Sequence, residues 1–144
     1  MKYFVFLLVA MICIMTAGAQ HHSWNVPKDA EMMQNPYVKS YFTDNSLKSD
    51  SGEFHFNFNC VPCHGEKGKG NGAARASLEP RPANLITEHT QEESDGSLFW
   101  KISNGHAPMP SFKNTMTDDQ IWQVITYFRY LCREENREKR EKQK

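Results

Sequence analysis

Two cysteines and a histidine stand close together near the middle of the chain, in the run Cys60-Val61-Pro62-Cys63-His64. This is the pattern C-x-x-C-H. Two intervening residues let both thiols add across vinyl groups on neighbouring pyrroles of a porphyrin, and the adjacent imidazole then falls under the iron. The pattern therefore predicts one covalently attached haem c, bound through Cys60 and Cys63, with His64 as a ligand of its iron.

Three other interpretations of these residues are weaker. A zinc ribbon needs a second pair of Cys or His ligands downstream, and Cys132 stands alone there. A thioredoxin-like Cys pair needs a strand–helix–strand setting, and the surrounding sequence predicts no strand. A structural disulfide between Cys60 and Cys63 leaves His64 without a role. Attachment of haem explains all three residues and is favoured.

A second axial ligand is predicted in the loop over residues 105–112. Met109 stands there between Pro108 and Pro110, whose rings stiffen the backbone and would hold the thioether toward a metal. His106 lies in the same loop and is the rival ligand. A methionine ligand favours ferrous iron and raises the reduction potential.

The remaining methionines of the mature chain fit other roles. Met116 directly precedes the predicted cap of the last helix, a position suited to packing, and Met32 and Met33 lie upstream of the cysteines. With His64 and Met109 both bound, iron has no open coordination position. The sequence thus predicts an electron carrier rather than an enzyme, with no small-molecule substrate. The alternative is a haem enzyme or a gas-binding sensor whose distal position is open.

The N-terminus has the pattern of a secretory signal peptide. Lys2 is followed by an apolar run over residues 3–15, and Ala17 and Ala19 form an A-x-A-like cleavage site. The apolar run is shorter than the about 20 residues that a spanning helix needs. We therefore predict that residues 1–19 are a signal peptide and that the protein is exported to the periplasm, with at most a peripheral association with the inner membrane.

Composition excludes further classes of function. The 144 residues suffice for one modest domain, and they include 17 basic and 17 acidic side chains. This neutral balance gives no support for nucleic-acid binding. Removal of the signal peptide leaves Cys60, Cys63 and Cys132, and an odd number of cysteines in an exported protein argues against a disulfide scaffold. Cys132 has no assigned role.

Hydrophobic periodicity predicts an all-α domain with three main helices. The first spans about residues 51–61 and the second spans 96–103. The third begins at a capping box over residues 117–120 and runs to about residue 131. The glycine-rich loop over residues 65–72 is predicted to be a flexible turn, because no strand precedes it and no phosphate-binding motif follows.

Around this domain the chain divides into simpler parts. Residues 20–51 are predicted to form a polar arm with a short helix near residues 28–34, and residues 52–131 form the haem domain. Residues 132–144 form a charged tail without an apolar side chain after Cys132, for which solvated chain is favoured over an extension of the last helix.

Over residues 52–131 the chain resembles the class I cytochromes c, especially small bacterial monohaem domains. Gly52 and Phe56 precede the first cysteine of the C-x-x-C-H motif by eight and four residues. In that family, a glycine and an aromatic residue at these offsets meet the last helix at a close crossing. The resemblance implies Val124 and Tyr127 as their partners.

Two further stretches carry the resemblance. Residues 81–85, Arg-Pro-Ala-Asn-Leu, are similar to the family's R-P-x-[DN]-L stretch. This implies that a backbone carbonyl near Pro82 accepts a hydrogen bond from the His64 ring. Residues 95–112 resemble the family's segment that carries the distal ligand in an M-P-S-F run, which implies Met109 in that role.

The resemblance implies a small cytochrome c fold in which three main helices surround one covalent haem and its iron. About 80 residues build only a small core by themselves, so the macrocycle is expected to fill much of the apolar interior. Redox proteins are the implied partners, such as a membrane quinol-oxidising complex or a terminal oxidase. The side chains expected to pack on the macrocycle are Phe54, Phe56, Phe58, Leu85, Phe99, Trp100, Phe112 and Ile125.

Four surface lysines have two possible roles. They could form a basic rim that steers an acidic partner, or they could be ordinary surface charge. These lysines are Lys67, Lys69, Lys101 and Lys113.

Overall fold

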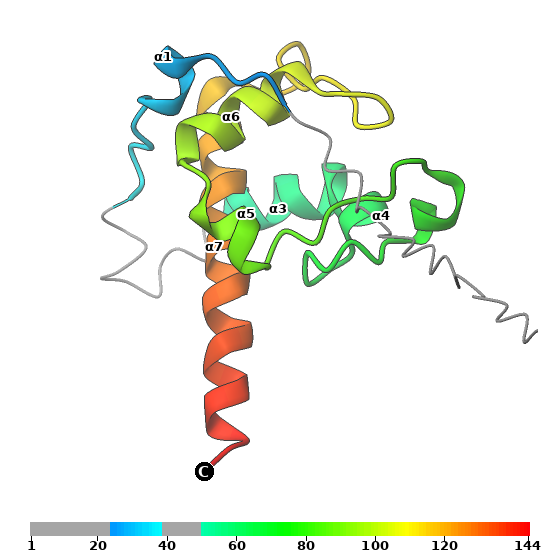
Figure 1. Ribbon diagram of the computed structural model, residues 1–144, viewed down its shortest axis with the longest axis vertical. Coiled ribbons are helices and arrows are strands. Elements are labelled where there is room, and N and C mark those ends of the chain that lie inside the picture. The colour runs from blue at the N-terminus through cyan, green and yellow to red at the C-terminus, as the bar shows by residue number, and fades with distance from the viewer. Residues whose placement is uncertain (1–23, 39–49) are drawn as a thin grey trace, which may run out of the picture.

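The computed structural model describes residues 24–38 and 50–144, so the predicted signal peptide, residues 1–19, lies outside the described part of the chain. Within that part the chain consists of helices and loops, apart from an isolated β-bridge between His106 and Met109. The all-α prediction is confirmed. The elements are α1 (Lys28–Glu31), α3 (Asp50–Asn59), α4 (Val61–His64), the 3-10 helix η2 (Ala73–Ser77), α5 (Glu88–Glu92), α6 (Asp95–Asn104) and α7 (Asp118–Glu141), most of them labelled in Figure 1.

The three predicted main helices are present as α3, α6 and α7. The first is shorter than expected, because α3 ends at Asn59 and α4 follows as a separate turn. Pro62 has no backbone N–H and therefore cannot continue the hydrogen-bond ladder of α3. At the start of α7, the predicted capping box is confirmed, since the side chains of Thr117 and Gln120 each accept a hydrogen bond from the other's backbone N–H.

The helices α3 and α7 cross closely at a glycine, as the resemblance implied. A Cβ atom on Gly52 would lie 2.6 Å from the backbone oxygen of Gln123, too close for any side chain to fit without a shift. One turn later Phe56 is fully buried, and its ring centroid lies 5.3 Å from that of Tyr127. The absence of a side chain at Gly52 thus lets the two helix backbones approach each other.

Two aromatic residues of α3, Phe54 and Phe58, lie outside the cluster of buried side chains. Phe54 and Phe58 are 62% and 75% exposed, and their rings stack on each other at the surface. Residues four positions apart share one face of a helix, so Gly52 and Phe56 face α7 while Phe54 and Phe58 point elsewhere.

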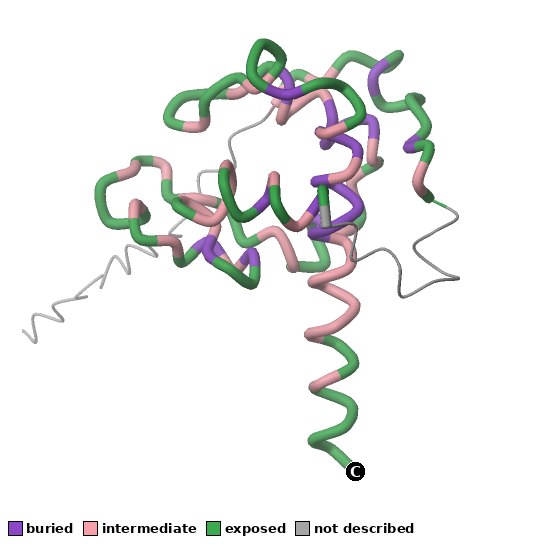
Figure 2. Tube along the Cα trace, turned by 180° about the vertical axis from the view of Figure 1, so that it is seen from behind, coloured by how far each residue is buried: buried purple, intermediate pink, exposed green. Residues whose placement is uncertain are grey.

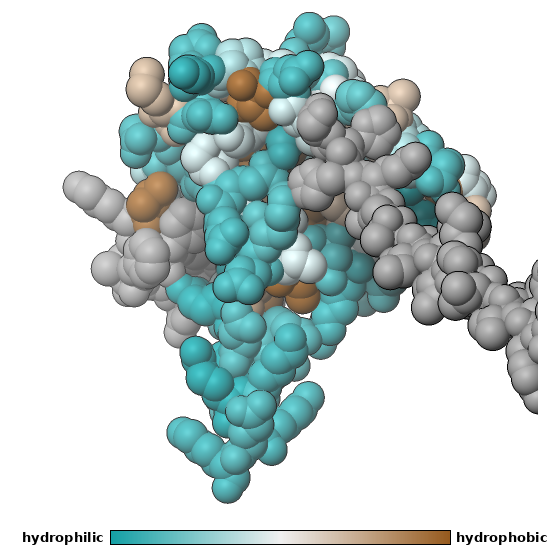
Figure 3. Space-filling model, in the orientation of Figure 1, coloured by the Kyte–Doolittle hydropathy of each residue, from teal (hydrophilic) through white to brown (hydrophobic). Residues whose placement is uncertain are grey.

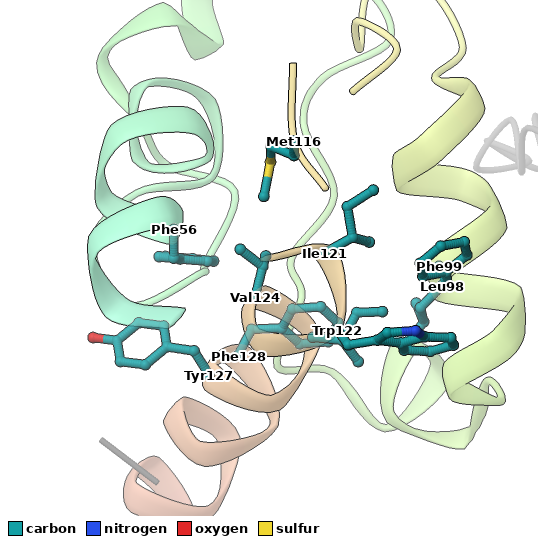
Figure 4. Packing of buried hydrophobic residues seen from close by; sticks show 10 residues of the cluster. Phe56, Leu98, Phe99, Met116, Ile121, Trp122, Val124, Tyr127 and Phe128 are labelled. Carbon is teal, nitrogen blue, oxygen red and sulfur yellow. The ribbon is translucent and has the colours of Figure 1, made fainter. Parts of the chain in front are cut away.

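The core lies between α3, α6 and α7 (Figure 4). Phe99 of α6 stacks on Trp122 of α7 with ring centroids 4.3 Å apart. Met116, which precedes the cap of α7, is buried in the same cluster, so its predicted packing role is confirmed. The other members are Phe56, Leu98, Ile121, Val124, Ile125, Tyr127 and Phe128.

The C-terminal segment is helical to Glu141, so the prediction of solvated chain was wrong. In Figure 1 the end of α7 extends well beyond the other helices, and Figure 3 shows hydrophilic side chains along it. Ion pairs between residues three and four positions apart stabilise such an exposed helix. The pairs within the extension are Arg137–Glu134, Arg137–Glu141 and Lys139–Glu135.

Among residues 24–38 and 50–144, no helix combines the length and the apolarity needed to cross a membrane.

The described part of the arm packs against α6 and α7. A Cβ atom on Gly96, in the first turn of α6, would lie 1.9 Å from the backbone oxygen of Ala30, so the glycine makes room for the arm. Asn35 is 4% exposed and donates from its side-chain nitrogen to the Asp95 carboxylate over 2.8 Å and to the Thr126 hydroxyl over 3.3 Å. The arm is therefore part of the folded domain.

Candidate haem site

The cysteines and the histidine of the C-x-x-C-H motif lie on one turn between α3 and the end of α4. The backbone N–H of Cys60 donates to the Phe56 carbonyl over 2.8 Å, and the N–H of His64 donates to the Cys60 carbonyl over 2.7 Å. Cys60 and Cys63 are both free thiols. The backbone hydrogen bonds thus place both cysteines and the histidine on a single helical turn of the chain.

The His64 ring is oriented by a backbone carbonyl. Its Nδ1 lies 2.9 Å from the Ala83 carbonyl oxygen, to which it donates as Nδ1–H. This agrees with the implied acceptor near Pro82. Burial lowers the pKa of His64, and the hydrogen bond to Ala83 opposes that shift. A neutral ring with Nδ1 engaged leaves Nε2 as the atom that can bind a metal.

The glycine-rich loop packs directly on this turn. A Cβ atom on Gly72 would lie 2.4 Å from the Pro62 carbonyl oxygen, and its N–H donates to the Cys63 carbonyl over 3.0 Å. Gly70 has a φ of +70°, and its N–H donates to the His64 carbonyl over 2.8 Å. The glycines therefore permit close contact between backbones as well as a change of direction, which the prediction of a flexible turn did not include.

The Cys60 thiol is in the neutral form at physiological pH. Burial, together with a smaller contribution from the neighbouring Cys63, raises the pKa of Cys60 to about 12. Zinc binding and thiol–disulfide exchange both use the thiolate, which this environment disfavours. In the described part of the chain, no three His, Cys, Asp or Glu side chains are grouped as a metal would need, so a zinc ribbon has no further ligands there.

Met109 lies on a tight turn that follows α6. The N–H of Met109 donates to the His106 carbonyl over 2.8 Å, and the N–H of His106 donates to the Met109 carbonyl over 3.0 Å. Gly105, with a φ of +66°, ends α6 and starts this turn. In Figures 1 and 2, the loop after α6 and the short helix α4 lie on the same side of α7. The fold thus presents His64 and Met109 from two separate segments.

The rival ligands differ from Met109 in their surroundings. Met116 is 7% exposed within the core, whereas Met32 is 73% exposed on the arm. His106 lies at the surface with its ring centroid 5.3 Å from that of Trp24. Met109 is partly buried and stands at the end of its turn, so it remains the candidate with the most suitable position.

The lysines expected to form a basic rim are mostly paired within the chain. Lys69 lies 2.9 Å from a Glu135 carboxylate oxygen, and Lys67 lies 3.9 Å from that of Glu138. Lys101 forms an ion pair with Glu93. These carboxylates weaken the positive field of the lysines, so the interpretation as ordinary surface charge is favoured over a steering rim.

The donor set and its surroundings fit a covalent haem. Two free thiols on one turn match two vinyl groups, and the imidazole of His64 has one nitrogen hydrogen-bonded to a backbone carbonyl and the other available. Leu85, Ile102 and Phe112 are only partly buried and pack against the core, which provides apolar surface for a macrocycle.

Comparison with known proteins decides the family. The sequence model of the family described as "Cytochrome C oxidase, cbb3-type, subunit III" matches residues 48–128, which is more than half of the chain. The chain belongs to this family. It is a small monohaem c-type cytochrome, an electron-transfer protein with redox proteins as partners, and its cofactor is covalently attached haem c with iron.

Two further relatives support the assignment. Cytochrome c6 from Leptolyngbya boryana is 33% identical over 72 residues, which cover 50% of this chain and 79% of the relative. A solved structure from the Kuenenia stuttgartiensis reducing HAO-like protein complex Kustc0457/Kustc0458 matches with a TM-score of 0.53 and 24% identity. The match covers 62% of this chain and 44% of that chain, and at this identity it shows the fold alone.

Some residues around the site carried no signal in the sequence. Trp24 packs on the Met109 turn from the arm, and Glu135 pairs with Lys69 of the glycine-rich loop from the end of α7. Both contacts join segments far apart in the chain. No local pattern marks them, and only coupling between distant positions in related sequences would have found them.

Proposed function

We propose that this cytochrome is an exported carrier of single electrons whose haem iron is ligated by His64 and Met109. The hydrogen bond between His64 Nδ1 and the Ala83 carbonyl supports this proposal most directly, because it leaves Nε2 as the free ring nitrogen. Met109 is then the second ligand, offered by the turn after α6. Two strong protein ligands leave no position for a substrate, so the protein itself catalyses no reaction.

Each part of the site has a defined task in this proposal. When bound, the haem supplies iron that changes between the ferrous and ferric states. Cys60 and Cys63 hold the group through thioether bonds, and Ala83 fixes the orientation of the His64 ring. The neutral thioether of Met109 favours the ferrous state and so raises the potential.

The location and the partners are part of the same proposal. The pattern of residues 1–19 supports export to the periplasm, with residues 20–51 as an arm, residues 52–131 as the haem domain and residues 132–144 as a charged tail that is helical to Glu141. A membrane quinol-oxidising complex and a terminal oxidase are the partners we favour. Affinity purification from native membranes, with identification of the redox subunits that co-purify, tests this assignment.

Replacement of Met109 tests the ligation. In the ferric protein, a sulfur-to-iron bond gives a weak near-infrared charge-transfer band. Met109→Ala should abolish this band, lower the potential and let the ferrous protein bind carbon monoxide. Met116→Leu is the control and should leave the band intact, because Met116 is buried in the core.

The alternatives predict different results. If His106→Ala opens the iron while Met109→Ala does not, the centre has two histidine ligands and the proposal is wrong. If the wild-type protein already binds carbon monoxide readily, a haem enzyme or a gas-binding sensor becomes the better hypothesis.

Attachment through the two cysteines has its own test. The intact mass of the exported protein should equal that of the chain from Gln20 onward plus one haem, and the haem should survive acid and organic solvent. Replacing both Cys60 and Cys63 by serine should make any bound haem extractable. Haem that extracts freely from the wild-type protein would contradict the thioether assignment.

A further inference from the structure

We infer that Trp24 is a positioning residue for the Met109 ligand, acting through His106; this inference rests on the proposed ligation by Met109. Trp24 lies in the arm, outside residues 48–128 that match the family. The arm therefore adds to this chain a contact that the matched domain does not itself contain.

The contact is made to the turn that carries Met109. The ring centroids of Trp24 and His106 lie 5.3 Å apart, with their planes inclined at 59°. His106 and Met109 exchange two backbone hydrogen bonds of 3.0 and 2.8 Å, so the two residues close the turn between them. A side chain that restrains His106 consequently restrains the backbone of Met109.

A second set of contacts fixes Trp24 itself. Its ring meets Trp100 of α6 edge-on, with centroids 6.3 Å apart, and the amino group of Lys101 lies 5.6 Å from its centroid. Aromatic pairs and cation–π contacts of this kind each stabilise a packed arrangement. Trp24 thus bridges α6, which is part of the core, and the turn that leaves it.

The arm is anchored at two more places along the domain. The Ala30 carbonyl sits against Gly96, and Asn35 binds Asp95 and Thr126. These contacts hold the arm against the first turn of α6, whereas the Met109 turn follows the last turn of that helix. Trp24 is therefore presented to the Met109 turn by a backbone that is already fixed. Opening of the Met109 turn therefore requires loss of the Trp24–His106 contact.

Displacement of the methionine by added imidazole measures this restraint. Imidazole binds ferric haem only after Met109 has left the iron, so its rate of binding reports how often the turn opens. In the haem-loaded protein, Trp24→Ala should raise the limiting rate about tenfold, which corresponds to about 1.4 kcal/mol. Trp24→Phe, which keeps an aromatic ring, should restore most of the wild-type rate.

Controls separate this role from general stability. Met32→Ala alters an arm residue that is 73% exposed and should leave the rate unchanged. His106→Ala removes the other partner, and combining it with Trp24→Ala should add little, because the two side chains act through one contact. If Trp24→Ala folds poorly, His106→Ala alone still tests the contact, because it removes the other partner and should raise the rate to a similar extent; an unchanged rate in His106→Ala would overturn the inference.

The results distinguish the two proposals. Equal imidazole rates for wild type, Trp24→Ala and Met32→Ala, with the charge-transfer band present in all three, overturn the positioning role and leave the ligation intact. A wild-type protein without that band overturns the ligation by Met109 and this inference together.

Discussion

The segment around His64 and the segment around Met109 are held in different ways. Contacts of His64 are local, since the Gly70 N–H reaches its carbonyl and the Ala83 carbonyl that orients its ring is 19 residues away. The Met109 turn closes on itself and is then restrained by Trp24, which stands 82 residues before His106. The proposed ligand His64 is thus held by nearby segments, and the proposed ligand Met109 is held by contacts with a distant part of the chain.

This difference predicts that substitutions in the two segments have two different effects. Changes near His64 disturb the turn that holds both cysteines, so they should reduce haem attachment and the stability of the whole fold. Changes at the contact of the arm with α6 should leave the covalent haem in place and weaken only the distal ligation. Substitutions of glycine offer the sharpest tests, because each adds one side chain where two backbones meet.

The largest effect is expected at Gly72. Gly72→Val places a side chain against the carbonyls of Val61 and Pro62, where even a Cβ atom would lie 2.5 and 2.4 Å away. We expect a loss of about 3 kcal/mol in the free energy of unfolding and a reduced haem content per polypeptide. Denaturant unfolding and the absorbance of the haem per chain measure both. The neighbouring Ala73 is exposed, and Ala73→Val should behave like wild type.

The helix crossing supports both segments and should give the next largest effect. Gly52→Leu forces α3 away from the Gln123 carbonyl of α7, and we expect it to destabilise the fold by about 1–3 kcal/mol. Thermal unfolding of the haem-loaded protein measures this loss, with exposed Ser51→Ala as the control. An unchanged melting temperature would show that the close approach of the helices is not required.

Substitution of Gly96 tests the contact between the arm and α6 separately from the C-x-x-C-H turn. Gly96→Ala sets a methyl group against the Ala30 carbonyl, where a Cβ atom would lie 1.9 Å away, so the arm must move. We expect a cost of about 1 kcal/mol, with normal haem content and a charge-transfer band that disappears at lower denaturant concentration than in wild type. A drop in haem content instead would mean that the arm also supports the C-x-x-C-H turn.

The smallest effect is expected where the end of α7 meets the glycine-rich loop. Glu135→Gln removes the 2.9 Å ion pair with Lys69, and a partly exposed pair contributes little to stability. We expect the melting temperature to fall by at most a few degrees. Glu138→Gln, which alters the longer 3.9 Å pair with Lys67, should have an even smaller effect. A large loss at Glu135 would show that the extension of α7 holds the loop against His64.

The chain's own sequence predicted the proximal half of the site in detail. The spacing of Cys60, Cys63 and His64 predicted the donor set, because spacing of this kind depends on fixed distances within one turn. The resemblance to the class I cytochromes c implied a carbonyl acceptor for the imidazole near Pro82, which is Ala83. The same resemblance implied the crossing of Gly52 and Phe56 with α7.

The remaining differences have separate causes. Phe54 and Phe58 were expected against the macrocycle, and they lie outside the helix core because the close approach at Gly52 selects the face of α3 that meets α7. The end of α7 was expected to be solvated chain, yet it is helical to Glu141, with ion pairs between residues three and four positions apart along it.

The sequence by itself therefore determined the covalent chemistry, the all-α fold and the candidate ligands His64 and Met109, because residue type and spacing control which bonds lie within reach. Only the tertiary structure decided what surrounds Met109, because the contact between Trp24 and His106 depends on how the described part of the arm packs across α6. Contacts of this kind arise from the approach of distant backbones, which no periodicity or short motif records.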